Sequence, residues 1–341
     1  MKKLLTGIFL IMLAITVGAC GVNNEANQGS TNSNSNVENS AKPSDNQQSA
    51  ETDTEDNEQA KATVYPLTVE DASGAELTFE QAPQRIVSTS SSETEILFAL
   101  GLGDRIYGVS DYDNYPEEAL SKPKIGGVYD PNEEVLLATQ PDLVIGGISM
   151  QEDMATRLRQ IGIKLYKTEP ENVEDALAII LQLGVITDTQ VKAEEIVAQM
   201  REDIRKVTEA AASIKDEDRK KVYIEFAPGW TVGSGEFMDE LITMAGGVNI
   251  AGTVVGWHLV NEEKIVQDNP DVILYAADLI DYDSGNSLRD IIKKRSGWST
   301  IKAIKEDQLI GLNEDIMSRT GPRLSQALLL VSEAIYPGLV K

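Results

Sequence analysis

The stretch NEEVLLATQPDLVI (residues 132–145) is matched without a gap by NEEKIVQDNPDVIL (residues 261–274), at a constant offset of 129 positions. The Asn, Glu, Glu, Pro and Asp are identical, and the apolar positions correspond. Both copies have the pattern of a helix, a turn and a buried strand. A chance likeness within a common pattern is one explanation. Two equivalent lobes are the simpler one, and a cleft between lobes is a favoured place for a ligand.

Strands alternate with helices around both copies, which predicts parallel α/β lobes. The expected strands are 85–88 and 106–109 in the first half and 222–226 and 272–276 in the second half. Ser92 and Glu95 have the spacing of a capping box ahead of an apolar helix face. Asp130 and Pro131 fit the N-cap and first position of the helix in the first copy.

The middle of the chain, residues 172–213, has a helical pattern without a strand, broken only near Gly184 and at 187–189. Residues 190–213 alone would form a helix about 36 Å long. We therefore predict an α/β protein in which two parallel-sheet lobes are joined by one long helix, with a ligand cleft between them. The expected bounds are 63–170 for the first lobe, 171–215 for the connecting helical segment and 216–341 for the second lobe.

Residues 1–19 have the pattern of a cleaved signal peptide. A basic start, Lys2-Lys3, precedes an apolar run at 4–17 that is too short to span a bilayer comfortably. The following VGAC (17–20) resembles the bacterial lipobox, in which the cysteine is lipidated and becomes the first residue. A chance cysteine is the alternative, but Cys20 is the only cysteine of the chain, and an intrachain disulfide is thereby excluded. We expect a lipid anchor at the extracytoplasmic face of the cell membrane.

Residues 20–62 form the predicted link between this anchor and the folded part. Asn, Ser, Gln, Glu and Asp dominate the segment, and large apolar residues are nearly missing from it. Such a composition does not bury enough surface to offset the entropy of ordering, so we expect a disordered tether. Its root-mean-square reach would be roughly 35 Å.

Charge and reactive side chains exclude several classes of function. A net charge of −25 makes nucleic acid a poor partner, because neutralising phosphates requires an excess of Lys and Arg. With one histidine and one cysteine there is no convincing Ser-His-Asp or Cys-His set, and there is no zinc-ligand spacing. Nothing singles out a catalytic pair of carboxylates. We therefore predict a protein that is not an enzyme and has no cofactor.

Short motifs follow one another in a fixed order after residue 64. They are RIVS (85–88), SETEILFALG (92–101), GG (126–127), PN (131–132), DEL (239–241), AGGVN (245–249), GW (297–298) and GPR (321–323). In this order, with the lipobox and a mid-chain helix, they resemble solute-binding proteins of ABC importers for iron-siderophores, haem and vitamin B12. The resemblance implies a monomer that captures an iron chelate, a siderophore or haem, and delivers it to the transmembrane subunits of the importer. Vitamin B12 (cobalamin) is the alternative ligand, and a surface adhesin or scaffold is the alternative of another class.

The resemblance also implies where the importer is contacted. The family places one exposed glutamate on each lobe to pair with arginines of the transmembrane subunits. The matching positions are Glu134 and Glu240. A solvated helix face is the alternative reading of both, and an exposed ion pair is worth only about 0–1 kcal/mol. We expect such pairs to guide orientation more than affinity.

In the first lobe, two serines and two tyrosines are the candidate ligand contacts. Ser91 and Ser92 precede or begin a helix, where free amides and the helix dipole favour anionic groups, although capping alone is an equal explanation. Tyr112 and Tyr129 lie on loops that follow strands, and in parallel α/β lobes such loops face the crevice. Their rings could stack on a planar ligand, and a phenolate can bind Fe(III). Surface tyrosines without a role are the alternative.

In the repeat alignment, Gly127-Val128-Tyr129 falls opposite Gly256-Trp257-His258 of the second lobe. We therefore expect Trp257 and His258 to lie on a loop that enters the cleft from the other side. Trp230 is a further candidate contact. Tyr129 and His258 are the candidate metal ligands through the bound chelate. His258 is the only histidine, and a structural role is the alternative for it. The remaining predicted contacts are Arg319 and Arg323, because an arginine fork suits carboxylate or propionate groups. Trp298 is assigned to the core.

The sequence departs from each ligand class of the family. Vitamin B12 binders carry tryptophans where this chain has Val128 and Gly147. Catecholate-siderophore binders line the cleft with several basic residues, whereas only Arg319 and Arg323 stand out here. Haem binders use a Tyr, His or Met ligand near Tyr129. The choice of ligand therefore stays open at this point.

Overall fold

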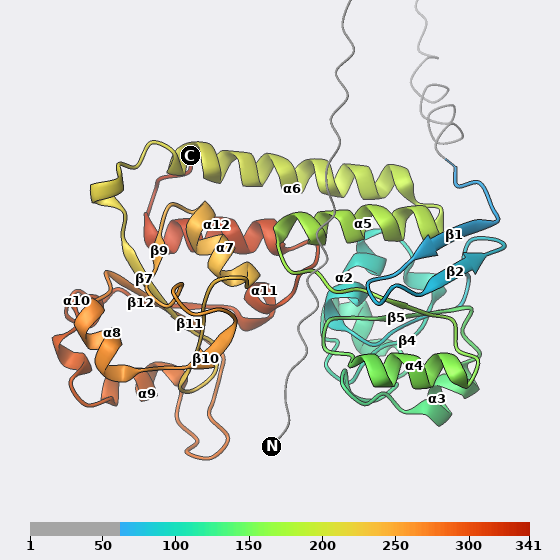
Figure 1. Cartoon of the computed structure of the whole chain (residues 1–341), viewed down its shortest axis with the longest axis horizontal. Helices are drawn as coiled ribbons and strands as arrows, with labels where there is room; N and C mark the ends of the chain where they lie inside the picture. Colours follow the sequence, from blue (N-terminus) through green and yellow to red (C-terminus); the bar gives the residue numbers. More distant parts are fainter. Residues whose placement is uncertain (1–61) are drawn as a thin grey trace, which may run out of the picture. The chain divides into compact units, whose positions relative to one another are not determined.

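The computed structural model describes residues 62–341. The predicted signal peptide, Cys20 and all but the last residue of the predicted tether lie outside the described residues. A hairpin comes first in the described chain and is formed by β1 (Leu67–Glu70) and β2 (Glu76–Phe79). It is followed by two α/β lobes, which Figure 1 shows in blue to green and in yellow to red. Between residues 62 and 341, no helix has the length and apolar character needed to cross a bilayer.

The first lobe is built on a four-stranded parallel sheet in the order β4-β3-β5-β6. Its strands are β3 (Ile86–Ser88), β4 (Ile106–Gly108), β5 (Leu143–Gly146) and β6 (Leu165–Lys167). Its helices are α2 (Ser91–Ala99), α3 (Glu133–Thr139) and α4 (Glu152–Gln160), with short 3₁₀ turns at Gly103–Arg105 and Glu117–Ser121. The two central strands, β3 and β5, are buried on both faces, as their nearly continuous apolar sequences require.

The second lobe repeats this plan, with a four-stranded parallel sheet in the order β9-β7-β11-β12. Its strands are β7 (Lys221–Glu225), β9 (Val248–Asn249), β11 (Val272–Ala276) and β12 (Leu309–Leu312). Its helices are α7 (Phe237–Met244), α8 (Glu262–Asp268), α9 (Leu288–Lys294), α10 (Lys302–Lys305), α11 (Glu314–Ser318) and α12 (Leu324–Ile335), with 3₁₀ turns at Asp216–Asp218 and Trp298–Thr300. A separate two-stranded ribbon is formed by β8 (Trp230–Val232) and β10 (Trp257–Leu259).

The helix of the sequence repeat begins in the same way in both lobes. The side chain of Asn132 accepts a hydrogen bond from the Val135 amide, and that of Asn261 accepts one from the Lys264 amide. Each asparagine is thus the N-cap of its helix, which satisfies one of the free amides of the first turn. The expectation that Asp130 caps α3 is wrong, because the helix begins two residues later.

The turn of the repeat also has one structure in both lobes. Gln140 and Asn269 adopt the left-handed conformation that ends α3 and α8. The carboxylate of Asp142 then accepts the amides of Gln84 and Arg85, just ahead of β3. The carboxylate of Asp271 accepts the Lys221 amide at the start of β7. The Pro-Asp pair therefore fastens each repeat to the neighbouring strand, which explains why both aspartates recur.

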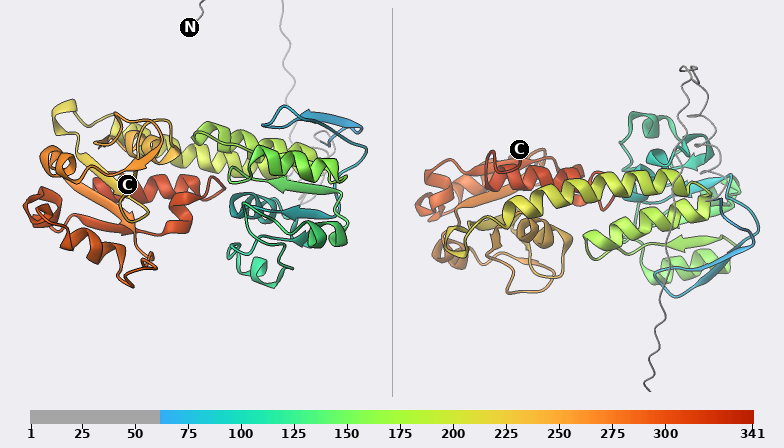
Figure 2. Two further views of the ribbon diagram at one scale, coloured as in Figure 1. Left: turned by 60° about the horizontal axis from the view of Figure 1, so that its bottom comes forward. Right: turned by 90° about the horizontal axis from the view of Figure 1, so that it is seen from above.

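The connecting segment consists of two helices, α5 (Val173–Thr187) and α6 (Gln190–Ala211), which Figure 2 shows side by side. The prediction of one long helix holds for α6 alone. Asp188 adopts a left-handed conformation at the break. Gly184 lies inside α5, where a Cβ atom would come within 2.5 Å of the Ala193 side chain on α6. The glycine permits this close approach of the two helices and does not end the first one.

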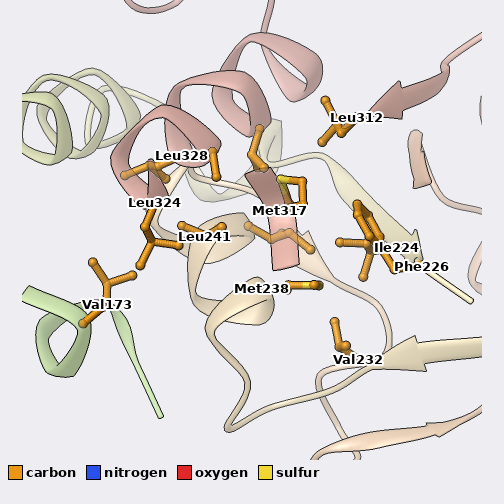
Figure 3. Close-up of a cluster of buried hydrophobic side chains, with 14 of the residues drawn as sticks. Val173, Ile224, Phe226, Val232, Met238, Leu241, Leu312, Met317, Leu324 and Leu328 are labelled. Carbon is orange, nitrogen blue, oxygen red and sulfur yellow. The ribbon is translucent and has the colours of Figure 1, made fainter. Parts of the chain in front are cut away.

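Buried apolar side chains join the connecting segment to the second lobe. Figure 3 shows Val173 of α5 facing the same cluster as Leu241 of α7 and Leu324 of α12. Leu328 and Met238 extend this cluster through the lobe. Trp298 is fully buried, which confirms its assignment to the core.

Candidate functional site

Three of the predicted contacts, Trp230, Trp257 and His258, lie on the ribbon of the second lobe. Strands β8 and β10 are antiparallel, with Leu259 opposite Trp230 and Trp257 opposite Val232. Trp230 is 41% exposed and Trp257 is 42% exposed, although burying a tryptophan is normally favourable. The expectation that Trp257 and His258 lie on a loop is wrong, since both belong to β10. The ribbon presents two large aromatic surfaces on a hydrogen-bonded frame.

His258 is half-buried, and its Nδ1 lies 3.1 Å from the Gly256 carbonyl oxygen. This contact fixes the ring locally. No group of three or more His, Cys, Asp or Glu side chains within residues 62–341 is arranged to hold a metal ion. A metal contact through His258 would therefore have to be made with a chelate that supplies the other ligands, and it stays a prediction.

Glu236 lies next to the ribbon. Partial burial raises the pKa of this carboxyl, while the indole of Trp257 acts in the opposite direction by interacting with the charged form. The neighbouring Gly256 has a positive φ of 75°, a conformation that glycine adopts without strain. The start of β10 is thus defined by a glycine turn and a carboxyl beside the indole.

In the first lobe, Ser91 and Ser92 lie in the first turn of α2 and are half-buried, and the N-cap is Ser90. The Ser90 side chain makes no capping hydrogen bond, so the amides at this helix end are not satisfied by it. Beneath these serines lies Glu93, whose Oε1 accepts a hydrogen bond from the Thr168 hydroxyl at 2.5 Å. Burial raises the pKa of Glu93, which favours the neutral acid at this position.

The two predicted tyrosines lie on adjoining loops. Tyr112 is 64% exposed and Tyr129 is 65% exposed. The Asp111 amide donates to the Gly126 carbonyl oxygen at 2.9 Å, which ties the first loop to the second. A Cβ atom on Gly127 would meet the Tyr112 ring at 4.0 Å. The structure therefore brings the two tyrosine loops together, whereas their opposition to Trp257 across a cleft stays a prediction.

Arg319 and Arg323 form a fork, but the carboxylate that it holds belongs to the chain itself. Arg323 donates from Nε to Glu95 Oε2 at 2.8 Å and from Nη2 to Oε1 at 2.6 Å. Arg319 donates from Nη1 to Glu95 Oε1 at 2.9 Å and from Nη2 to Asp315 at 2.6 Å. Glu95 is only 3% exposed. It is not the partner of a capping box, because its carboxylate is turned toward the second lobe to neutralise the two guanidinium groups.

The ion cluster borders a pocket that the sequence did not indicate. The Arg323 guanidinium lies 3.9 Å from the centre of the Tyr115 ring. The cavity has a volume of about 320 Å³ and is lined by Glu95, Phe98, Ala99, Tyr115, Pro116, Glu118, Pro322 and Arg323. Glu95 and Arg323 in its lining are already paired with each other, so the ribbon and the tyrosine loops offer the more accessible contacts for a ligand.

The two predicted docking glutamates differ in their surroundings. Glu134 is exposed on α3. Glu240 is half-buried, and its Oε2 accepts the Val173 amide at 2.7 Å, so the expectation that it is exposed is wrong. The carboxylate satisfies a free amide at the first turn of α5. The counterpart of Glu134 in the sequence repeat is Glu263, which is exposed on α8. The alignment of the two repeat copies could therefore have identified Glu263 as the second candidate.

Known proteins resemble the chain over most of its length. It is 32% identical over 288 residues to an uncharacterized ABC transporter substrate-binding lipoprotein, YvrC, of Bacillus subtilis strain 168, with 82% of this chain and 89% of that protein covered. It is 24% identical over 286 residues to a cobalamin-binding protein of Halobacterium salinarum, with 81% and 76% covered.

Among solved structures, the periplasmic heme-binding protein RhuT from Roseiflexus sp. RS-1, in its apo form, has 27% sequence identity and a TM-score of 0.64, and the match covers 75% of this chain and 99% of that one. The family model described as periplasmic binding protein matches residues 86–316, more than half of the chain. Together with the two parallel-sheet lobes, these matches settle the family. The chain belongs to the periplasmic binding protein family and is an ABC-importer substrate-binding protein of the type that includes the siderophore, haem and vitamin B12 binders.

Proposed function

We propose that this protein captures an iron chelate, a siderophore or haem, between its lobes and delivers it to the transmembrane subunits of an ABC importer. The observation that carries the proposal is the pair of exposed tryptophans on the hydrogen-bonded ribbon of the second lobe. Exposed aromatic rings on a rigid frame suit the face of a large planar ligand. The haem-binding relative supports this ligand class.

The first lobe would supply the polar half of the site. The hydroxyls of Ser91 and Ser92 and the amides of the first turn of α2 suit anionic groups of a chelate. The exposed phenols of Tyr112 and Tyr129 suit stacking, and Tyr129 is the better placed by the repeat to face Trp257. Phenolate oxygen is a hard ligand, which suits Fe(III) more than softer metals. His258 is the corresponding candidate on the ribbon.

Cobalamin is the second candidate ligand. The same two tryptophan rings, of Trp230 and Trp257, could contact the face of a corrin, and a cobalamin-binding protein is among the relatives. Cobalamin offers amide groups rather than carboxylates around the ring. The serine-lined start of α2 would then donate to amide oxygens. A titration with representatives of each class separates the two candidates.

The importer would be contacted through one exposed glutamate on each lobe, Glu134 and Glu263. They occupy equivalent positions on equivalent helices, α3 and α8. Glu240 is less suitable, because its carboxylate already binds the Val173 amide. Reversing both charges, as Glu134→Arg with Glu263→Arg, is expected to abolish uptake and to leave ligand affinity within about twofold, since surface pairs direct orientation.

Glu134→Arg with Glu240→Arg is the comparison for that experiment. This pair should lower the melting temperature, because removal of the Glu240 carboxylate exposes a helix end. Uptake by cells that express each variant is the measurement. An equal loss of uptake and of ligand affinity in the Glu134/Glu263 variant would contradict the docking role.

The remaining parts of the proposal concern location and assembly. Cys20 would carry the lipid that holds the protein outside the membrane, and the protein would act as a monomer without enzymatic activity or cofactor. The Bacillus relative, described as a lipoprotein, supports the anchor. A Cys20→Ala variant should be released or remain unprocessed. The rival of another class, an adhesin or scaffold, predicts neither ligand capture nor a permease partner.

Purification of residues 63–341 from native cells, with mass and absorbance analysis of any bound ligand, tests the proposal most directly. Titration with haemin, a ferric hydroxamate and cyanocobalamin, followed by tryptophan fluorescence, complements it. We expect saturable quenching by one iron chelate. Saturation by cyanocobalamin alone would select the second candidate, and no saturation by any of the three would contradict the ligand class.

A further inference from the structure

A buried ion pair lies at the base of the tryptophan ribbon. Glu225 is the last residue of β7 and is fully buried. Arg295, which follows α9, donates from Nη1 to Glu225 Oε2 at 2.6 Å and from Nη2 to Oε1 at 2.6 Å. The pair is therefore bidentate, the geometry that fixes both groups most strongly.

The carboxylate of Glu225 also holds a turn of the backbone. Its Oε1 accepts the Gly229 amide at 2.9 Å. Gly229 has a φ of 77° and directly precedes Trp230, the first residue of β8. The Gly229 carbonyl oxygen in turn accepts the amide of Val260, the residue that follows β10, at 2.9 Å. The turn on Glu225 is thus bonded to the start of one ribbon strand and to the end of the other.

Arg295 is itself held in place from other sides. Its guanidinium lies 4.7 Å from the centre of the buried Trp298 ring. Its Nε lies 3.3 Å from the carboxylate of Glu262, the first residue of α8. The Tyr223 hydroxyl donates to Glu225 Oε2 at 2.7 Å. The Glu225 carboxylate and the Arg295 guanidinium therefore have few alternative positions. The Gly229 turn, which is bonded to the carboxylate, is restricted in the same way.

We propose that Glu225, held by Arg295, is a positioning residue for the ligand wall of the second lobe. It fixes the Gly229 turn and so holds the rings of Trp230 and Trp257 in place before a ligand arrives. A preorganised wall binds more tightly, because less conformational entropy is lost on binding. The inference rests on the proposed function only in treating the ribbon as part of the ligand site.

The chain offers a matched control in the second buried carboxylate, Glu95. It is also nearly fully buried and also forms a bidentate pair, with Arg323, but it accepts its hydrogen bonds from arginine side chains. Glu95→Gln therefore removes a comparable buried charge without touching a backbone turn. Glu225→Gln keeps an acceptor for Gly229 but loses the charge that binds Arg295. If the variants act only by lowering stability, both should show the effect. If Glu225 positions the ribbon, only Glu225→Gln should show it.

The experiment compares the full chain, its Glu225→Gln variant and its Glu95→Gln variant after incorporation of fluorotryptophan. The fluorine NMR signals of Trp230 and Trp257 and the amide exchange of Gly229 and Val260 are measured without ligand. We expect shifted or broadened ribbon signals and at least about tenfold faster exchange in Glu225→Gln, with little change in Glu95→Gln. If Glu225→Gln does not fold, Arg295→Lys replaces it in the experiment. This variant keeps the positive charge but loses the bidentate contact with Glu225.

Haemin, a ferric hydroxamate and cyanocobalamin are then titrated into the same samples. For the probe that binds the unmodified chain, we expect at least about tenfold weaker binding to Glu225→Gln and a change within threefold for Glu95→Gln. Ribbon signals that respond equally in both variants would overturn the proposal, as would a loosened ribbon with unchanged affinity. If the unmodified chain binds no probe, the proposed ligand class fails, and the ribbon signals alone decide whether Glu225 positions the turn.

Discussion

The two lobes share one backbone plan but differ at the carboxyl edge of their sheets. In both, an asparagine caps the repeat helix and an aspartate fastens the turn to the adjacent strand. Beyond the sheet edge, the first lobe presents half-buried serines above a buried acid, Glu93. The second lobe presents a tryptophan ribbon above a buried ion pair. The duplicated part is the scaffold, and the parts that differ are those that would meet a ligand.

This difference also concerns how each lobe stabilises buried charge. The carboxylate of Glu225 is paired within the second lobe by Arg295. Glu95, on α2 of the first lobe, is paired by Arg319 and Arg323, which both precede α12 of the second lobe. One pair therefore braces a lobe internally, and the other contributes to the contact between lobes. The variants below test this division, beginning with the largest expected effect.

Removal of a guanidinium should be more harmful in the second lobe than between the lobes. Arg295→Met leaves a fully buried carboxylate without its bidentate partner, and we expect a loss of about 3–5 kcal/mol in the free energy of unfolding. Arg323→Met leaves Glu95 in contact with Arg319, so we expect about 1–3 kcal/mol. Urea denaturation of both variants is the measurement. Equal losses in the two variants would show that the remaining contact with Arg319 does not stabilise the Glu95 carboxylate.

Ligand affinity should depend on aromatic rings from both lobes. Tyr129→Ala with Trp257→Ala deletes one exposed ring from each, and we expect at least about 2 kcal/mol of binding energy to be lost, roughly thirtyfold in affinity. Titration of the bound chelate against intrinsic fluorescence measures the loss, with the melting temperature as a control because Trp257 belongs to a strand. Unchanged affinity in a folded double variant would place the ligand elsewhere.

The shared scaffold should respond equally in the two lobes. Asn132→Ala and Asn261→Ala each remove the N-cap acceptor of a short helix, and we expect each to lower the free energy of unfolding by about 1 kcal/mol. Asn132→Asp and Asn261→Asp retain the acceptor and serve as controls. Chemical denaturation is sufficient to resolve the effect. A loss in only one of the two alanine variants would show that the matching caps do not contribute equally to the free energy of unfolding.

The smallest expected effect is a pH dependence in the first lobe. Burial raises the pKa of Glu93 above its ordinary value of 4.5, so the folded state holds the proton more tightly than the unfolded state does. This contribution to stability is fully present below the unfolded pKa and is lost as the pH rises through the folded pKa. Glu93→Gln should therefore gain melting temperature relative to the unmodified chain as the pH rises above 4.5. A constant difference across that range would contradict the assignment.

The duplicated plan of the two lobes could be predicted from short stretches of neighbouring residues. The matching stretches 132–145 and 261–274 contain the capping asparagine, the Pro-Asp turn and a buried strand, all of which act over a few neighbouring residues. Local hydrogen bonds of this kind depend on side-chain type and spacing, so α3, α8, β5 and β11 could be predicted, although α3 begins two residues later than expected. The same repeat aligns Glu263 with Glu134, and the exposure of Glu263 on α8 makes it the candidate docking residue of the second lobe.

The pairing of distant charges, in contrast, depends on how the lobes and helices pack. Glu95 reads as a capping residue in sequence, yet its carboxylate meets Arg319 and Arg323 more than two hundred positions later. Glu240 reads as a surface glutamate, yet it binds the amide of Val173. Nothing in local spacing encodes these partners, because a buried charge is stabilised by whichever opposite charge or free amide the packing of lobes and helices brings within about 3 Å.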